Sequence, residues 1–92
     1  MKRLKAHAGA IKALGATSLY LFGSTARNEA AQGSDLDLFV DYDPHGRFNA
    51  LDLVDIKLML EAELGISVDV TTRDSLHPML RGDIERSAVR VF

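Results

Sequence analysis

Two short stretches decide the fold: Gly23-Ser24, which closes one apolar run, and Ser34-Asp35-Leu36-Asp37-Leu38, which opens the next. Ten residues separate the serine of the first stretch from the first aspartate of the second. Each stretch says little alone, because a Gly-Ser pair is typical of ordinary strand-to-helix turns and Asp-x-Asp of the solvated face of a strand. Together they indicate a phosphate-binding turn facing a pair of metal-binding carboxylates.

The aspartates carry the chemistry of this hypothesis. Side chains two residues apart on a strand project from one face, so Asp35 and Asp37 lie roughly 7 Å apart at the backbone. A hard cation such as Mg²⁺ relieves their mutual repulsion. Asp69 lies mid-strand between two valines, where aspartate is depleted. Beside Asp37 it would complete a three-carboxylate cluster for two metal ions; the alternative is a solubilising charge on an edge strand.

The turn supplies the groups expected to hold a phosphate. Gly23 lets the backbone approach closely, and Ser24 adds a hydroxyl beside the N–H groups of a helix start. Arg27, one helical turn later, has two open interpretations. It can bind a phosphate as a fork, or it can pair with Glu29 or another acid.

Length and composition indicate one small domain spanning residues 1–92. The chain is 47% hydrophobic, has no cysteine and carries a net charge of -2. No apolar stretch approaches the ~20 residues of a membrane span, and no signal-peptide core follows the basic start. We therefore expect a cytoplasmic protein with no membrane association. Direct nucleic-acid binding is not expected, because a long basic tract is absent.

Hydrophobic periodicity and turn residues predict an α/β (α+β) fold, with a small sheet covered by helices. Residues 89–92 remain open between a frayed helix end, an edge strand and a docking tail. The expected helices are 2–15, 25–31, 50–64 and 78–88, and the expected strands are 18–22, 35–42 and 66–71. The first strand is expected to be buried on both faces, and Ser24, Asn49 and Gly65 are expected to cap helices.

The helix expected at 50–64 has two apolar stripes on opposite sides. Since one stripe is enough to pack on a sheet, the other must meet another helix of the domain or a partner. One version of a partner hypothesis assigns the free surface to the second stripe, through Leu53 and Leu60. The first stripe contains Leu51, Val54, Leu58 and Ala62, and the second contains Leu53, Ile56, Leu60 and Leu64.

The combined pattern resembles a known family. The stretch from Gly23 to Arg27, the ten-residue gap, Ser34 to Leu38, Val68-Asp69-Val70 and the Pro78 helix are similar to the DNA-polymerase-β-like nucleotidyltransferase superfamily, and most similar to its minimal nucleotidyltransferases. The resemblance covers nearly the whole chain. Asn28 stands where the family usually has glycine, and asparagine tolerates the left-handed conformation.

The resemblance implies a mixed sheet with flanking helices, two Mg²⁺ ions, and transfer of AMP from ATP to an acceptor hydroxyl. By position, Asp35 and Asp37 would be metal ligands, and Asp69 would be a third ligand able to activate the acceptor. Gly23, Ser24 and, on the fork interpretation, Arg27 would bind the nucleotide.

Minimal nucleotidyltransferases are typically antitoxins encoded beside a HEPN-domain toxin, so the resemblance also implies such a partner, modified on a tyrosine. Two alternatives stay open. The chain could neutralise its toxin by binding alone, or it could be a nucleotidyltransferase for a small-molecule acceptor. The short chain disfavours the second, because it leaves little room for a separate acceptor-binding domain.

Overall fold

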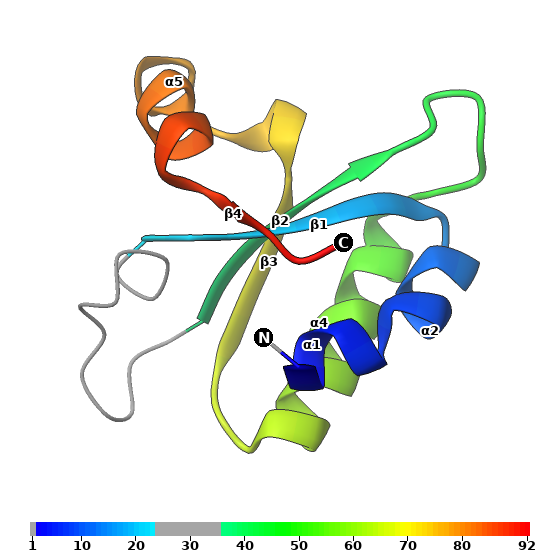
Figure 1. Ribbon diagram of the computed structural model, residues 1–92. Coiled ribbons are helices and arrows are strands. Elements are labelled where there is room, and N and C mark those ends of the chain that lie inside the picture. The colour runs from blue at the N-terminus through cyan, green and yellow to red at the C-terminus, as the bar shows by residue number, and fades with distance from the viewer. Residues whose placement is uncertain (1, 24–35) are drawn as a thin grey trace.

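The computed structural model describes residues 2–23 and 36–92 and arranges them around one mixed sheet (Figure 1). The strand order is β3-β2-β1-β4. β2 pairs in parallel with β3 and antiparallel with β1, which pairs antiparallel with β4. This confirms the predicted α/β architecture. The elements are α1 (Lys2–Ala6), α2 (Ala8–Ala13), β1 (Ala16–Phe22), β2 (Leu36–Tyr42), α4 (Ala50–Leu64), β3 (Val68–Thr72), the 3₁₀ turn η1 (Arg73–Ser75), α5 (Pro78–Ser87) and β4 (Val89–Arg90).

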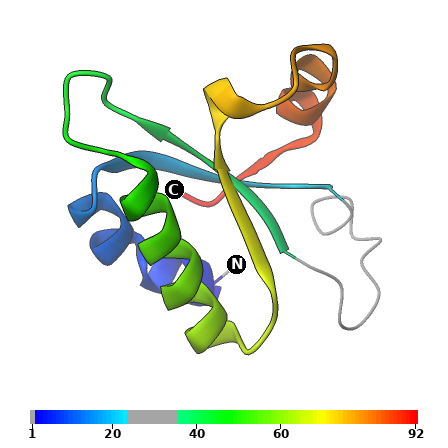
Figure 2. The ribbon, with the colours of Figure 1, turned by 180° about the vertical axis from the view of Figure 1, so that it is seen from behind.

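One face of the sheet forms the core against α1, α2 and α4, which lie together on that side (Figure 2). The predicted alternation of β2 is confirmed, because its even-numbered apolar residues point into this core. From α4, Ile56 and Leu60 are fully buried. The buried residues of this core are Leu4, Ile11, Ala16, Leu19, Leu21, Leu36, Leu38, Val40, Ile56, Leu60, Val68 and Val91.

The opposite face of the sheet carries aromatic rings, and α5 lies on this side of the molecule (Figure 1). Phe39 of β2 is fully buried and stacks on Tyr20 of β1, with ring centroids 4.8 Å apart. The Phe22 ring lies 5.7 Å from the same phenylalanine. Tyr20 and Phe22 are only half-buried, so the expectation that the first strand is buried on both faces is wrong for this side.

Local capping signals place the helix ends where the sequence predicts them. The Asn49 side chain accepts hydrogen bonds from the Leu51 and Asp52 N–H groups, and the Asp52 carboxylate accepts from the Asn49 N–H. Gly65 ends α4 in the left-handed conformation at φ 68°, as expected of a C-terminal glycine. Pro78 opens α5. No helix in the described part of the chain is both long and apolar enough to cross a membrane.

Several predicted elements have different bounds in the structure. β1 begins at Ala16 instead of residue 18, and α5 ends at Ser87 instead of residue 88. The helix expected over 2–15 is interrupted at His7, whose N–H bonds to the Leu4 carbonyl three residues back. Such a bond tightens the turn, and the neighbouring Gly9 is a poor helix former. The third strand begins at Val68 instead of residue 66, because the preceding residues lead the chain out of α4.

Residues 89–92 contain an edge strand, followed by the buried residue Val91. β4 pairs with β1, and the Val91 N–H donates to the Leu19 carbonyl at 2.8 Å. The Val91 side chain is 3% exposed and belongs to the core. Of the three interpretations left open for this segment, the edge strand is confirmed.

One apolar stripe of α4 is buried and the other is exposed. The partner hypothesis that placed the free surface at Leu53 and Leu60 is wrong. Leu60 is fully buried and Leu53 packs against the core. The other stripe faces away from the sheet, with Leu51 74%, Val54 48% and Leu58 57% exposed. Both stripes have the same spacing in sequence, so the helical period could not decide which one meets the sheet.

A matched pair of substitutions tests this orientation. Leu60→Ala should lower the free energy of unfolding by about 2–5 kcal/mol, because it leaves a cavity in the core. Leu58→Ala is the same chemical change two residues earlier, about half a turn around the helix on its exposed side, and it should change the free energy of unfolding by less than about 0.5 kcal/mol. Urea unfolding followed by circular dichroism measures both. Equal destabilisation would mean that α4 is rotated about its axis.

Candidate active site

Asp37 and Asp69 are opposite each other on neighbouring strands. The parallel register of β2 and β3 pairs the Cα atoms of these two residues. Since paired residues on adjacent strands project from the same face, both carboxylates leave the sheet on the side away from α4. Asp37 is half-buried and Asp69 exposed. The expectation that the third strand would bring Asp69 beside Asp37 is confirmed.

Gly23 brings the turn after β1 against the Asp37 carboxylate. Phe22, the last residue of β1, pairs with Asp37 across the antiparallel ladder, and the glycine follows it at φ 75°. A Cβ atom built on Gly23 would lie 2.6 Å from Asp37 Oδ2. Both the positive φ and the close approach therefore require glycine here.

The remaining predicted site residues lie outside the described part of the chain. These are Ser24, Arg27 and Asp35, together with Asn28 and the short helix expected at 25–31. Within residues 2–23 and 36–92, no three acidic or histidine side chains are grouped closely enough to hold a metal ion on their own. A metal site at Asp37 and Asp69 would thus need a third ligand from elsewhere, and Asp35 is the residue that the sequence predicts.

A cleft of about 410 Å³ opens beside the glycine turn. It is lined by Phe22 and Gly23 from the end of β1, and by Asp83, Ile84 and Ser87 from α5. The last helix therefore borders the turn expected to bind phosphate. These α5 residues could not be identified from the sequence, because no local signal relates a helix face to a turn some sixty positions earlier.

Arg73, also not identified from the sequence, connects the open face of the sheet to α5. Its guanidinium binds Asp41 of β2 through two bonds, Nε to Oδ1 at 2.7 Å and Nη2 to Oδ2 at 3.0 Å. Its Nη1 donates to Glu85 of α5 at 2.8 Å. The same group lies over the rings of Tyr20 and Phe39, 4.9 and 5.0 Å from their centroids. One arginine thus joins three elements by ionic and cation–π contacts.

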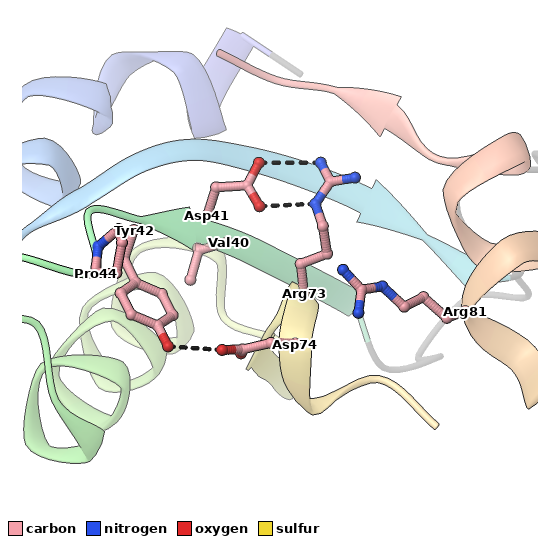
Figure 3. A pocket seen from close by; sticks show the side chains of 7 residues that line it. All are labelled: Val40, Asp41, Tyr42, Pro44, Arg73, Asp74 and Arg81. Atoms are coloured by element: carbon pink, nitrogen blue, oxygen red, sulfur yellow. Dashed lines mark hydrogen bonds and ion pairs between the residues drawn. The ribbon is translucent and has the colours of Figure 1, made fainter. Parts of the chain in front are cut away.

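A second polar network lies beside this arginine around a cleft of about 220 Å³ (Figure 3). The Tyr42 hydroxyl donates to Asp74 Oδ2 at 2.7 Å, and the Thr72 hydroxyl donates to Asp74 Oδ1 at 2.5 Å. Arg81 of α5 also lines the cleft and binds Glu85 at 2.9 Å. These contacts hold η1 and α5 against the end of β2.

The hydrogen bonds of these networks shift several pKa values. The hydrogen bond from Arg73 to Asp41 is the main reason that the arginine pKa is raised. Donation by Thr72, then by Tyr42, lowers the pKa of Asp74. Burial alone would raise the pKa of Glu85, but hydrogen bonds from Arg73 and Arg81 outweigh it and the pKa is lowered.

The geometry defines a class: a small mixed sheet with carboxylates aligned on adjacent strands beside a glycine turn. A model of the nucleotidyltransferase domain family matches residues 4–91. The "Putative protein adenylyltransferase MJ0435" of Methanocaldococcus jannaschii is 46% identical over 72 residues, which are 78% of this chain and 75% of that protein. The "Protein adenylyltransferase MntA" of Thermococcus cleftensis is 32% identical over 77 residues, covering 84% and 76%.

Solved structures agree with this assignment. The structure of a "putative minimal nucleotidyltransferase" matches with a TM-score of 0.75 and 37% identity, over 96% of this chain and 92% of that one. A toxin–antitoxin structure with AMP-PNP matches in fold, with a TM-score of 0.77 and 17% identity over 100% and 73%.

The chain therefore belongs to the nucleotidyltransferase domain family, within the polymerase-β-like superfamily. It is an enzyme of the minimal nucleotidyltransferase type.

Two glycine substitutions separate backbone strain from the close approach to Asp37. Gly23→Ala should slow nucleotidyl transfer about 100-fold, because an added Cβ displaces the Asp37 carboxylate and small misplacements are costly in catalysis. Gly65→Ala carries a similar positive φ but meets no atom within 4 Å. It should cost stability, about 1–3 kcal/mol, and leave transfer intact. Pyrophosphate release and thermal melting measure the two effects. Normal transfer by Gly23→Ala would contradict a role for this contact.

The lowered pKa of Glu85 predicts an acid-dependent loss of stability. A carboxylate whose folded pKa is depressed stabilises the fold above its unfolded value of about 4.5 and loses this contribution as the pH falls through the folded value. Glu85→Gln should therefore melt below the wild type at neutral pH. The difference should narrow below about pH 4.5. Melting curves across this range test it, and a difference independent of pH would contradict the ionic role.

Proposed function

We propose that this chain transfers the adenylyl group of ATP to a hydroxyl group of a partner protein, and that it acts in this way as an antitoxin. The observation that carries the proposal is the alignment of Asp37 with Asp69, with Gly23 against the first carboxylate. Relatives named protein adenylyltransferases support a protein acceptor. Fold neighbours described as toxin–antitoxin complexes support a toxin as that acceptor.

The donor set fits a hard divalent cation. Carboxylate oxygens are the ligands that Mg²⁺ prefers, and a cation between two in-register carboxylates on one face would relieve their mutual repulsion. Asp35 and Asp37 are the proposed metal ligands, and Asp69 is the proposed third carboxylate. Two bound Mg²⁺ ions would neutralise the charge of the triphosphate and of the attacking oxygen.

The proposed reaction uses the two sides of the site in different ways. Gly23 and Ser24 hold the triphosphate through backbone N–H groups and a hydroxyl, and Arg27 adds a cationic fork. The acceptor oxygen forms a bond to the α-phosphorus while the bond from that atom to the bridging oxygen breaks. Pyrophosphate leaves, and Asp69 accepts the proton of the acceptor hydroxyl.

The finer assignment of the acceptor rests on the family resemblance. Minimal nucleotidyltransferases typically accompany a HEPN-domain toxin, so a tyrosine of such a toxin is the proposed acceptor. A second candidate function is neutralisation by binding alone. The exposed apolar stripe of α4 favours it, because exposed apolar surface marks interaction sites and this surface lies away from the carboxylates on the sheet.

A label-transfer experiment tests the enzymatic proposal. The purified chain, ATP labelled at the α-phosphate, Mg²⁺ and the protein encoded by the adjacent reading frame should give a labelled partner. Asp37→Asn combined with Asp69→Asn should lower the rate of transfer by more than roughly 100-fold. Loss of a residue that only hydrogen-bonds to a metal ligand costs roughly 10–100-fold, and these two residues are proposed to be ligands themselves. Chelation with EDTA should have the same effect.

The control is Asp43→Asn, which removes a carboxylate from an exposed turn. Asparagine can still accept the bond that the His45 N–H now donates to Asp43, so transfer should match the wild type. No labelling of the partner by the wild type would refute the proposal. Full neutralisation of the partner's toxicity by the double aspartate variant would favour binding alone.

A further inference from the structure

The outer face of α4 combines exposed apolar residues with negative charge. Leu51, Val54 and Leu58 recur at helical spacing and are 74%, 48% and 57% exposed, and they define what we call the α4 stripe. Asp55 lies among them, three positions from Leu58 and four from Leu51, and forms no hydrogen bond or ion pair with any residue that the structure describes. Contiguous exposed apolar surface of this kind marks interaction sites.

The flanks of the α4 stripe are acidic. Lys57 is the one basic residue of the helix, against the acids Asp52, Asp55, Glu61 and Glu63. Three of these acids have internal contacts, and one of them is Glu63, whose carboxylate lies 3.7 Å from the imidazole of His7. Asp52 closes the capping box, and Glu61 accepts a hydrogen bond from the Val68 N–H at 3.0 Å. Asp55 is therefore the charge that a docked surface would meet directly.

The negative charge around the α4 stripe indicates which kind of protein surface could bind there. Pairing two copies of the α4 stripe would bring the Asp55 residues and two net-negative helices together, and like charges at an interface cost several kcal/mol. A partner whose apolar contact residues are bordered by lysine or arginine would neutralise the same charge. We infer that the α4 stripe docks a protein partner with an apolar surface and a basic rim. The inference rests on the proposed function in one respect, because it takes this partner to be the toxin.

The location separates docking from catalysis. Ile56 and Leu60 turn the inner side of α4 toward the sheet, so the α4 stripe faces away from it. Asp37 and Asp69 leave the sheet on its other face. α4 lies against one face of the sheet (Figures 1 and 2), so the helix and the sheet lie between the stripe and the carboxylates. A partner held at α4 reaches the carboxylates only with a segment that extends around the sheet, or from a neighbouring complex.

Binding measurements with the purified protein of the adjacent reading frame test this inference. Leu51→Ser with Leu58→Ser should raise the dissociation constant at least tenfold. Asp55→Lys should raise it as well, with a difference from the wild type that shrinks as salt is added. The matched control is Leu80→Ser on α5, which removes a leucine of similar exposure, 55%, and should change affinity less than twofold. All four substituted side chains are exposed, and melting curves confirm folding.

The outcomes distinguish this inference from the proposed function, because label transfer is measured in the same mixtures. Tight binding by the wild type without labelling of the partner would refute the transferase proposal and leave the docking surface standing. Normal affinity of both the double serine variant and Asp55→Lys would overturn the docking inference. Self-association of the wild type that the double variant abolishes, or no complex with the adjacent protein, would overturn it too.

Discussion

The parallel pairing of β2 with β3 is the constraint on which the rest of the structure depends. The register that buries Leu36 and Val68 side by side also aligns Asp37 with Asp69 on the opposite face. A slip of one residue would turn the aspartate of β3 into the core and its valines outward. Core packing and the position of the carboxylates are therefore set by the same hydrogen bonds, and the site needs no separate scaffold.

The open face of the sheet is organised by charge and aromatic stacking. Phe39 is covered by the rings of Tyr20 and Phe22 and by the guanidinium of Arg73, which in turn binds Asp41 and Glu85. This arrangement fixes α5 beside the glycine turn with few apolar contacts. Ionic contacts of this kind depend on pH and salt, whereas the packing of α4 on the other face depends on neither to the same degree.

Features with a local cause could be predicted from the sequence. The N-terminal cap at Asn49, the C-terminal glycine Gly65 and the alternation of β2 each follow from residues within a few positions, and all were predicted correctly. The proximity of Asp37 and Asp69 required the additional assumption that their strands are neighbours, which the register confirms. The roles of Ser24, Arg27 and Asp35 stay predictions, since these residues lie outside the described ranges.

Features set by distant partners could not be predicted in this way. Nothing near Arg73 in sequence indicates that it would contact Tyr20, Phe39 and Asp41 at once. The two stripes of α4 are equivalent by helical period, and only the packing of the sheet distinguishes them. The ambiguity of residues 89–92 has the same origin, because an edge strand is defined by the neighbour that it pairs with.

The edge formed by these last residues has a consequence for synthesis of the chain. β1 is made early but has β4 as its outer neighbour, and Val91 fills the core against it. Until residues 89–92 leave the ribosome, β1 presents unsatisfied N–H and C=O groups along that side, which is the condition under which strands pair with other chains. A nascent chain stalled before these residues would thus expose this edge of β1 to pairing with other chains.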